Sequence, residues 1–114
     1  MANKTKTYIT IQPDGKVEKH ENVAWELKDL QKNVGGGYIE GVTFKIQDQN
    51  YRGWANEEGL LKRFPVNSKA SHYRAAYYGV NKEDPRYKLY TLVGPIIVEN
   101  FKGDEKLVWL QTFY

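Results

Sequence analysis

The run Gly35-Gly36-Gly37 separates two segments of the chain that have different hydrophobic periods. Before it, Asn22 is suited to cap a helix, and apolar residues then recur at helical spacing at Val23, Leu27, Leu30 and Val34. After it, residues 38–46 alternate with a period of two, as the residues of a strand do. Because glycine readily adopts the left-handed conformation found after a helix, the triplet predicts that a helix ends here and that a strand follows.

Turn-forming residues divide the rest of the chain into similar short segments. Pro13-Asp14-Gly15 predicts a hairpin that joins residues 7–11 to residues 17–19, and Asn67 or Ser68 is suited to cap a second helix that ends near residue 78. The other predicted strands are residues 51–55, 89–98 and 107–113, with a turn at 48–50 and a polar loop at 80–86. We therefore expect an α+β fold, in which a mostly antiparallel sheet of about five to six strands has two helices packed on one side of it.

Length and composition exclude several classes of protein. A chain of 114 residues, 40% of them hydrophobic, has the size of one domain with one core, so we expect a single domain over residues 1–114. The absence of cysteine excludes disulfides and cysteine nucleophiles, and the distant His20 and His72 do not suggest a metal site, so no cofactor is expected. No stretch approaches the ~20 apolar residues that cross a bilayer, and none resembles a signal peptide. We expect a cytoplasmic protein with no membrane partner.

Positive charge and tyrosine are concentrated in one part of the chain. Residues 62–88 have a local net charge of +5, whereas the whole chain has +3, and five tyrosines lie within residues 73–90. Cations suit phosphates and aromatic faces suit bases, so this region is a candidate site for a nucleotide or a nucleic acid. The same composition is expected if the tyrosines pack a helix against the sheet and the cations form a solvated face. The sequence leaves both interpretations open.

Three carboxylates are candidates for chemistry. Glu40 lies on the apolar face of its predicted strand, so it is either paired, with Arg63 or Arg74 as partner, or placed at a strand end or at the mouth of a cleft. Glu57 and Glu58 have the chemistry of an acid or a base, but a polar turn of this composition is usually only a turn. The sequence has no nucleophile motif, no metal-ligand spacing and no phosphate-binding glycine loop before a helix. We therefore predict that the protein is not an enzyme.

Several short groups of residues occur together in a fixed order. They are Asp14-Gly15, Leu30-Gln31 with residues 34–40, residues 56–59 with Pro65-Val66-Asn67, and Val93-Gly94-Pro95. In this order the chain resembles, over residues 9–98, the small phage and plasmid proteins of domain-of-unknown-function family 3846. It departs from them in its third glycine, in the insertion at residues 73–90 and in the tail at 109–114. The resemblance implies a setting in mobile elements of bacteria, where small proteins without a catalytic motif often sequester nucleotide immune signals or block a host enzyme.

From the residues and the resemblance we expect a phage-type counter-defence protein of the host bacterial cytoplasm. Its expected role is to sequester a nucleotide-derived immune signal, without cleaving it, in a pocket where the strand at 38–40 meets residues 56–67. The arginines suit phosphate, the aromatic rings suit a base, and the amides and carboxylates suit ribose hydroxyls or base edges. The candidate ligand-binding residues are Tyr38, Glu40, Trp54, Asn56, Glu58, Arg63, Asn67, Arg74 and Tyr78.

Two other roles fit the same sequence. The protein could inhibit or regulate a host or phage enzyme by docking on it through exposed aromatics, such as those of residues 109–114, because tyrosine, tryptophan and arginine are frequent in interface hot spots. It could also bind single-stranded nucleic acid through residues 62–88. The apolar residues 109–114 would be costly to leave exposed, so they either form the last strand of the sheet or close a homodimer or higher oligomer.

Overall fold

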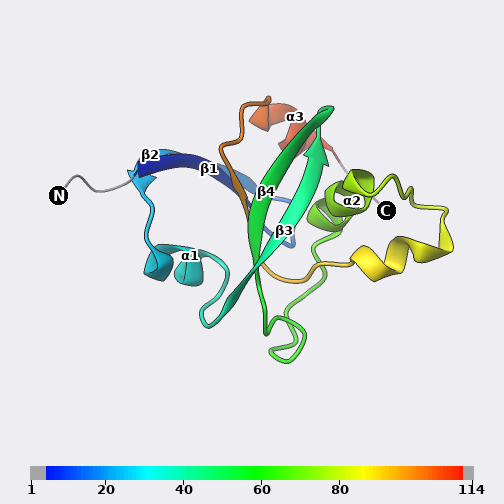
Figure 1. The fold of residues 1–114 in the computed structure, drawn as a ribbon, viewed down its shortest axis with the longest axis horizontal. Helices are drawn as coiled ribbons and strands as arrows, with labels where there is room; N and C mark the ends of the chain where they lie inside the picture. Colours follow the sequence, from blue (N-terminus) through cyan, green and yellow to red (C-terminus); the bar gives the residue numbers. More distant parts are fainter. Residues whose placement is uncertain (1–4, 112–114) are drawn as a thin grey trace.

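The computed structural model describes residues 5–111, which form a five-stranded antiparallel sheet with helices packed on it (Figure 1). The expected α+β class is therefore confirmed. The sheet has the order β2-β1-β5-β4-β3, and every pair of neighbouring strands is antiparallel. The strands are β1 (Thr5–Ile11), β2 (Val17–Ala24), β3 (Ile39–Ile46), β4 (Gln49–Asn56) and β5 (Ile96–Glu99).

Helices cover both faces of this sheet. The helices are α1 (Leu27–Asn33), α2 (Ser68–Tyr77), the 3-10 helix η1 (Pro85–Tyr90) and α3 (Glu105–Leu110). On one face, Tyr73 of α2 and Val108 of α3 join the main core of the protein. On the other face, Leu30 of α1 packs in a smaller cluster with Tyr8 and Ile97. The prediction that helices lie on one side only is wrong, because alternate residues of β1 and β5 are apolar on both faces and each face needs cover.

The two hairpins form much as the sequence predicts. β1 and β2 pair around residues 12–16, and β3 and β4 pair along their whole length. The turn between β3 and β4 consists of Gln47 and Asp48, whose φ angles of 52° and 62° are those of a two-residue hairpin turn. It therefore lies one residue earlier than the predicted 48–50.

Asn22 does not cap a helix. It lies in β2 with φ 50°, because β2 continues to pair with β1 as far as Ala24 opposite Thr5. Helix α1 begins only at Leu27, and Glu26 is its N-cap residue. It ends as predicted, since Gly35, Gly36 and Gly37 all have positive φ.

The last third of the chain contains less strand than predicted. Of residues 89–98, the first two end η1, and Val93 makes an isolated bridge to Val66 before β5 begins at Ile96. η1 lies partly in the predicted polar loop at 80–86, where Asp84 caps the helix by accepting a hydrogen bond from the Arg86 amide. Leu92 is buried without belonging to a strand, whereas η1 contacts α2 but has no buried residue, and its Leu89 is exposed.

The predicted final strand at 107–113 is instead helix α3 over its described part. Asp104 caps this helix by accepting a hydrogen bond from the Lys106 amide, and Val108 is its buried residue. Residues 112–114 of the predicted strand lie outside the described residues. Within residues 5–111, no helix is both long enough and apolar enough to cross a bilayer.

Candidate functional site

A hollow of about 170 Å³ lies where β3 meets the end of β4, beside α2 and the segment that precedes β5. This is the junction at which the sequence predicts a pocket, and three of the predicted site residues line it, namely Glu40, Asn56 and Arg74. The full lining is Glu40, Ala55, Asn56, Glu57, Leu60, Arg74, Thr91, Leu92 and Val93. We call this hollow the α2 hollow.

Arg74 is the positively charged residue of the α2 hollow. Its side chain is half-buried, and its Nε atom is buried without an acceptor among residues 5–111. Within the same residues, no ion pair joins it to Glu40 or Glu57, so the predicted Glu40–Arg74 pair is not formed. Glu40 lies instead at the exposed end of β3, one of the two placements that the sequence left open. An anionic group of a ligand would meet an arginine that is not already neutralised.

An aromatic cluster lies at the C-terminal end of α2, one turn beyond Arg74, where Tyr77 and Tyr78 meet Tyr90 of η1. Tyr78 stacks on Tyr90 with ring centroids 4.7 Å apart and an angle of 20° between the rings, and Tyr77 meets Tyr78 edge-on at 5.1 Å. Residues four apart share one helix face, and Tyr90 directly precedes Thr91, which lines the hollow. The cluster therefore lies close to the α2 hollow and offers flat aromatic surface to solvent.

Asn56 and Asn67 are used by the scaffold. The Nδ2 of Asn56 donates to the carbonyl oxygens of Val34 and Gly36, at 3.0 and 2.5 Å. The Nδ2 of Asn67 donates to Ile11 and Gly94, while its Oδ1 accepts from the Ala70 amide as the N-cap of α2. Asn67 has 0% exposed surface. Both amides therefore hold the segments that shape the α2 hollow.

The other predicted site residues lie away from this hollow. Trp54 projects on the opposite face of the sheet, where its Nε1 donates to Glu99 at 2.5 Å. Glu58 pairs with Lys62 at 3.8 Å, whereas Tyr38 and Arg63 are exposed residues outside the hollow lining. The structure thus brings together Glu40, Asn56 and Arg74, with Tyr78 beside them. Sequence reasoning missed Thr91 because it was assigned to a buried strand, and it counted Tyr90 among the tyrosines of the basic region without naming it as a site residue.

The basic region at 62–88 is not one continuous positive face. Lys69 is 6% exposed and donates to the carbonyl oxygens of Gly15 and Trp109, and burial lowers the pKa of its ammonium group. Arg86 pairs with Asp84 at 2.7 Å, and hydrogen bonds from the Arg86 side chain lower the pKa of the Asp84 carboxyl to about 2. Three of the seven cations, counting Lys62, are therefore already engaged. Four remain for an anionic partner, Arg74 among them.

Within residues 5–111, no group of three or more histidine, aspartate and glutamate side chains is placed to hold a metal ion. Glu40 and Glu57 are the two carboxylates that line the α2 hollow, and Arg74 lines it as well. The hollow thus combines hydrogen-bond acceptors with one cation, an arrangement suited to holding a polar ligand.

The fold and the hollow define a small α+β domain that presents a half-buried arginine beside an exposed aromatic cluster. The chain belongs to the family described as Domain of unknown function (DUF3846), whose sequence model matches residues 6–110. The family resemblance drawn from the short residue groups is therefore confirmed, and it extends beyond residues 9–98. Neither the curated proteins nor the solved structures contain a match to this chain.

Proposed function

We propose that the protein binds a nucleotide-type ligand at the α2 hollow and holds it without chemical change. The observation that carries this proposal is Arg74, whose buried Nε lacks an acceptor among residues 5–111 and which lies one helical turn from the stacked Tyr78–Tyr90 pair. A guanidinium group binds phosphate through charge-assisted, bidentate hydrogen bonds. Tyrosine faces stack on bases.

The size of the α2 hollow determines how such a ligand would lie. Pockets that enclose a whole small molecule usually have about 300–1,000 Å³, whereas this one has about 170 Å³. The hollow therefore takes part of the ligand, the phosphate and ribose, with Glu40 and Glu57 accepting hydrogen bonds from hydroxyl groups. The base lies outside, against the exposed ring of Tyr78.

The biological role in this proposal is the one that the family resemblance suggests. In a phage or plasmid setting, a protein that holds a nucleotide-derived immune signal would lower its free concentration in the host cytoplasm. Binding alone is sufficient for this role, because a ligand held in a stoichiometric complex no longer reaches its receptor.

Titration calorimetry of the full chain with a panel of cyclic and ADP-ribose-type nucleotides tests the proposal. For a nucleotide that binds, we expect Arg74→Gln to weaken the affinity about tenfold or more, since a charge-assisted hydrogen bond contributes about 1.5–3 kcal/mol. Lys82→Gln, which removes an exposed charge outside the hollow lining, is the matched control. Native mass spectrometry should return the nucleotide intact. Equal affinities for the two variants, or a converted nucleotide, would contradict the proposal.

Docking on a protein partner is the second candidate function, and an apolar surface at the rim of the α2 hollow favours it, since Leu60 also lines that hollow. Leu60 and Leu61 are 79% and 85% exposed, although they are adjacent large apolar residues in the loop after β4. Exposed apolar groups of this kind mark interaction sites when they are contiguous. A pull-down from host lysate with the natural chain and with Leu61→Ser, which lies outside the hollow lining, separates the candidates: one stoichiometric protein lost with this variant, while nucleotide affinity is unchanged, favours docking.

A further inference from the structure

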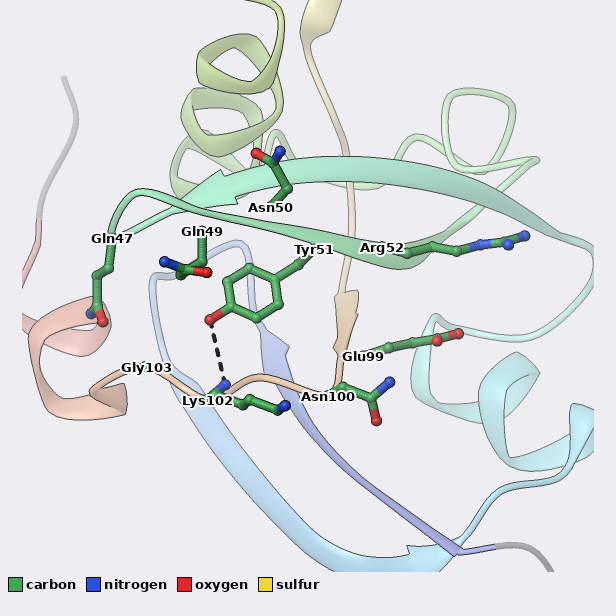
Figure 2. A pocket seen from close by; sticks show the side chains of 9 residues that line it. All are labelled: Gln47, Gln49, Asn50, Tyr51, Arg52, Glu99, Asn100, Lys102 and Gly103. Atoms are coloured by element: carbon green, nitrogen blue, oxygen red, sulfur yellow. Dashed lines mark hydrogen bonds between the residues drawn. The ribbon is translucent and has the colours of Figure 1, made fainter.

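The sheet opens where β5 ends, and this opening forms a hollow that is larger than the α2 hollow (Figure 2). β4 pairs with β5 at only two positions, Gly53 with Val98 and Trp54 with Ile97. At Asn100, with φ 52°, the chain turns out of the sheet, so residues 49–52 of β4 have no described strand on the side away from β3. A hollow of about 550 Å³ remains between β4 and residues 99–103. We call it the sheet-gap hollow.

The lining of the sheet-gap hollow is rich in polar groups that the fold does not use. Within residues 5–111, no side-chain hydrogen bond is formed by Gln49, Asn50 or Asn100, and no ion pair is formed by Arg52 or Lys102. In addition, alternate backbone N–H and C=O groups of residues 49–52 point into the gap, because β4 uses the others to pair with β3. The hollow therefore offers donors, acceptors and positive charge to a ligand.

The one carboxylate in this lining is already compensated. Glu99 accepts a hydrogen bond from Trp54 through Oε1 and pairs through Oε2 with Lys6 at 3.2 Å. Its charge therefore does not neutralise the two cations of the hollow. Figure 2 shows Lys102 on the wall opposite β4, whereas Arg52 leaves β4 and extends toward the side where Glu99 lies, so each wall carries one positive group. Both groups attract an anion that enters the hollow.

The walls of the hollow are held in place by contacts within the protein. The Oη of Tyr51 accepts a hydrogen bond from the Lys102 amide at 3.4 Å, as Figure 2 shows. Gln47 both donates to the Asp104 carbonyl and accepts from the Asp104 amide, each at 2.9 Å. The guanidinium of Arg52 lies 4.9 Å from the centre of the Trp54 ring, which orients it and leaves its N–H edge available. These contacts fix the backbone of both walls, whereas the unbonded side chains of the lining become ordered when a ligand binds.

We propose that the sheet-gap hollow is a second binding site, whose ligand is a small molecule with a phosphate monoester and several hydroxyl groups. The two cations bind the phosphate, and the unused amides of Gln49, Asn50 and Asn100 donate to and accept from the hydroxyls. The volume lies within the roughly 300–1,000 Å³ of sites that enclose a small molecule. The site shares no residue with the α2 hollow, so it does not depend on the function proposed there.

The test is a titration of the full chain with ribose 5-phosphate, followed by amide NMR spectra. We expect the signals of residues 49–52 and 99–103 to shift, with inorganic phosphate binding more weakly and ribose more weakly still. Arg52→Gln and Lys102→Gln should each weaken binding of ribose 5-phosphate about tenfold. Lys32→Gln, which removes an exposed charge on α1, should leave the affinity unchanged, and the dispersion of each variant's spectrum shows that it is folded.

Two outcomes overturn the proposal. One is that ribose 5-phosphate leaves the signals of residues 49–52 and 99–103 unmoved. The other is that Arg52→Gln and Lys102→Gln bind it as tightly as Lys32→Gln does. Arg74→Gln separates the two sites: a loss of binding with Arg52→Gln but not with Arg74→Gln supports the sheet-gap site alone, and the reverse result supports the α2 hollow alone.

Discussion

Single buried polar side chains connect distant parts of this chain. Asn67 is the clearest example, because one amide caps α2 and also binds the carbonyl oxygens of Ile11 and Gly94. The capping role was predictable, since asparagine before a helical segment is a strong local pattern. Its other two bonds were not predictable, because their partners lie 56 and 27 residues away in the sequence.

Replacement of Asn67 by alanine should destabilise the protein strongly. The variant loses the N-cap of α2 and leaves two buried carbonyl oxygens without this donor, so we expect the free energy of unfolding to fall by about 2–4 kcal/mol. Urea denaturation followed by circular dichroism measures the change. Ser68→Ala at the neighbouring exposed position is the control and should change stability little. A loss below about 1 kcal/mol for Asn67→Ala would show that water replaces these bonds.

His72 should make stability depend on pH. Burial and then the positive charge of Lys82 lower the pKa of its ring below the ordinary value of 6.5. The unfolded chain therefore binds more protons than the folded chain as the pH falls through 6.5, and stability decreases until the pH reaches the folded pKa. Thermal unfolding between pH 7.5 and pH 5.5 should show this decrease. His72→Phe keeps an aromatic ring without titration and should remove that part of the decrease.

At the level of secondary structure, local patterns were reliable where pairing is local. Both hairpins and α2 were predictable because turn and cap residues are adjacent to the segments that they organise. The segments at 89–98 and 107–113 were not, because apolar composition alone does not distinguish a strand from other buried structure. In the candidate site, Arg74 and Glu40 could be selected by type, whereas the separation of Trp54 from them depends on the face to which β4 directs it.

The short contact between β4 and β5 should be sensitive to one glycine. A Cβ added at Gly53 would overlap the Ile97 carbonyl oxygen and lie 2.6 Å from the Phe44 ring. We expect Gly53→Ala to lower the free energy of unfolding by more than about 2 kcal/mol, since overpacking of this kind forces strands apart. Gly41→Ala on β3 is the matched control, because its nearest neighbours are 3.6 Å away. If urea denaturation gave Gly53→Ala and Gly41→Ala equal stabilities, the close approach of Gly53 to Ile97 would be contradicted.

At the scale of the whole molecule, the order of the strands in the sheet makes the core depend on β5. β5 lies between the two hairpins, pairing with β1 on one side and with β4 on the other, yet it follows both hairpins in the sequence. The main core includes Ile96 and Val98 of this strand, both with 0% exposed surface. Each hairpin can form early, whereas the joined sheet and its core require the last strand.

A chain that ends at Pro95 should therefore not form the native sheet. It retains both hairpins and α2 but lacks the strand that joins them, so we expect poorly dispersed amide NMR signals. A marginally stable hairpin alone does not hold side chains in fixed positions. A dispersed, native-like spectrum from this truncated chain would show that the hairpins pack without β5.

The position of β5 also has a consequence for folding during synthesis. While the ribosome makes the chain from its N-terminal end, the β1–β2 and β3–β4 hairpins emerge with open, unpaired inner edges, and nothing local closes them. Closure waits until residues 96–99 leave the exit tunnel, so each hairpin keeps an unpaired strand edge, prone to association, from its own emergence until then. Chaperones that shield extended segments would act in that interval.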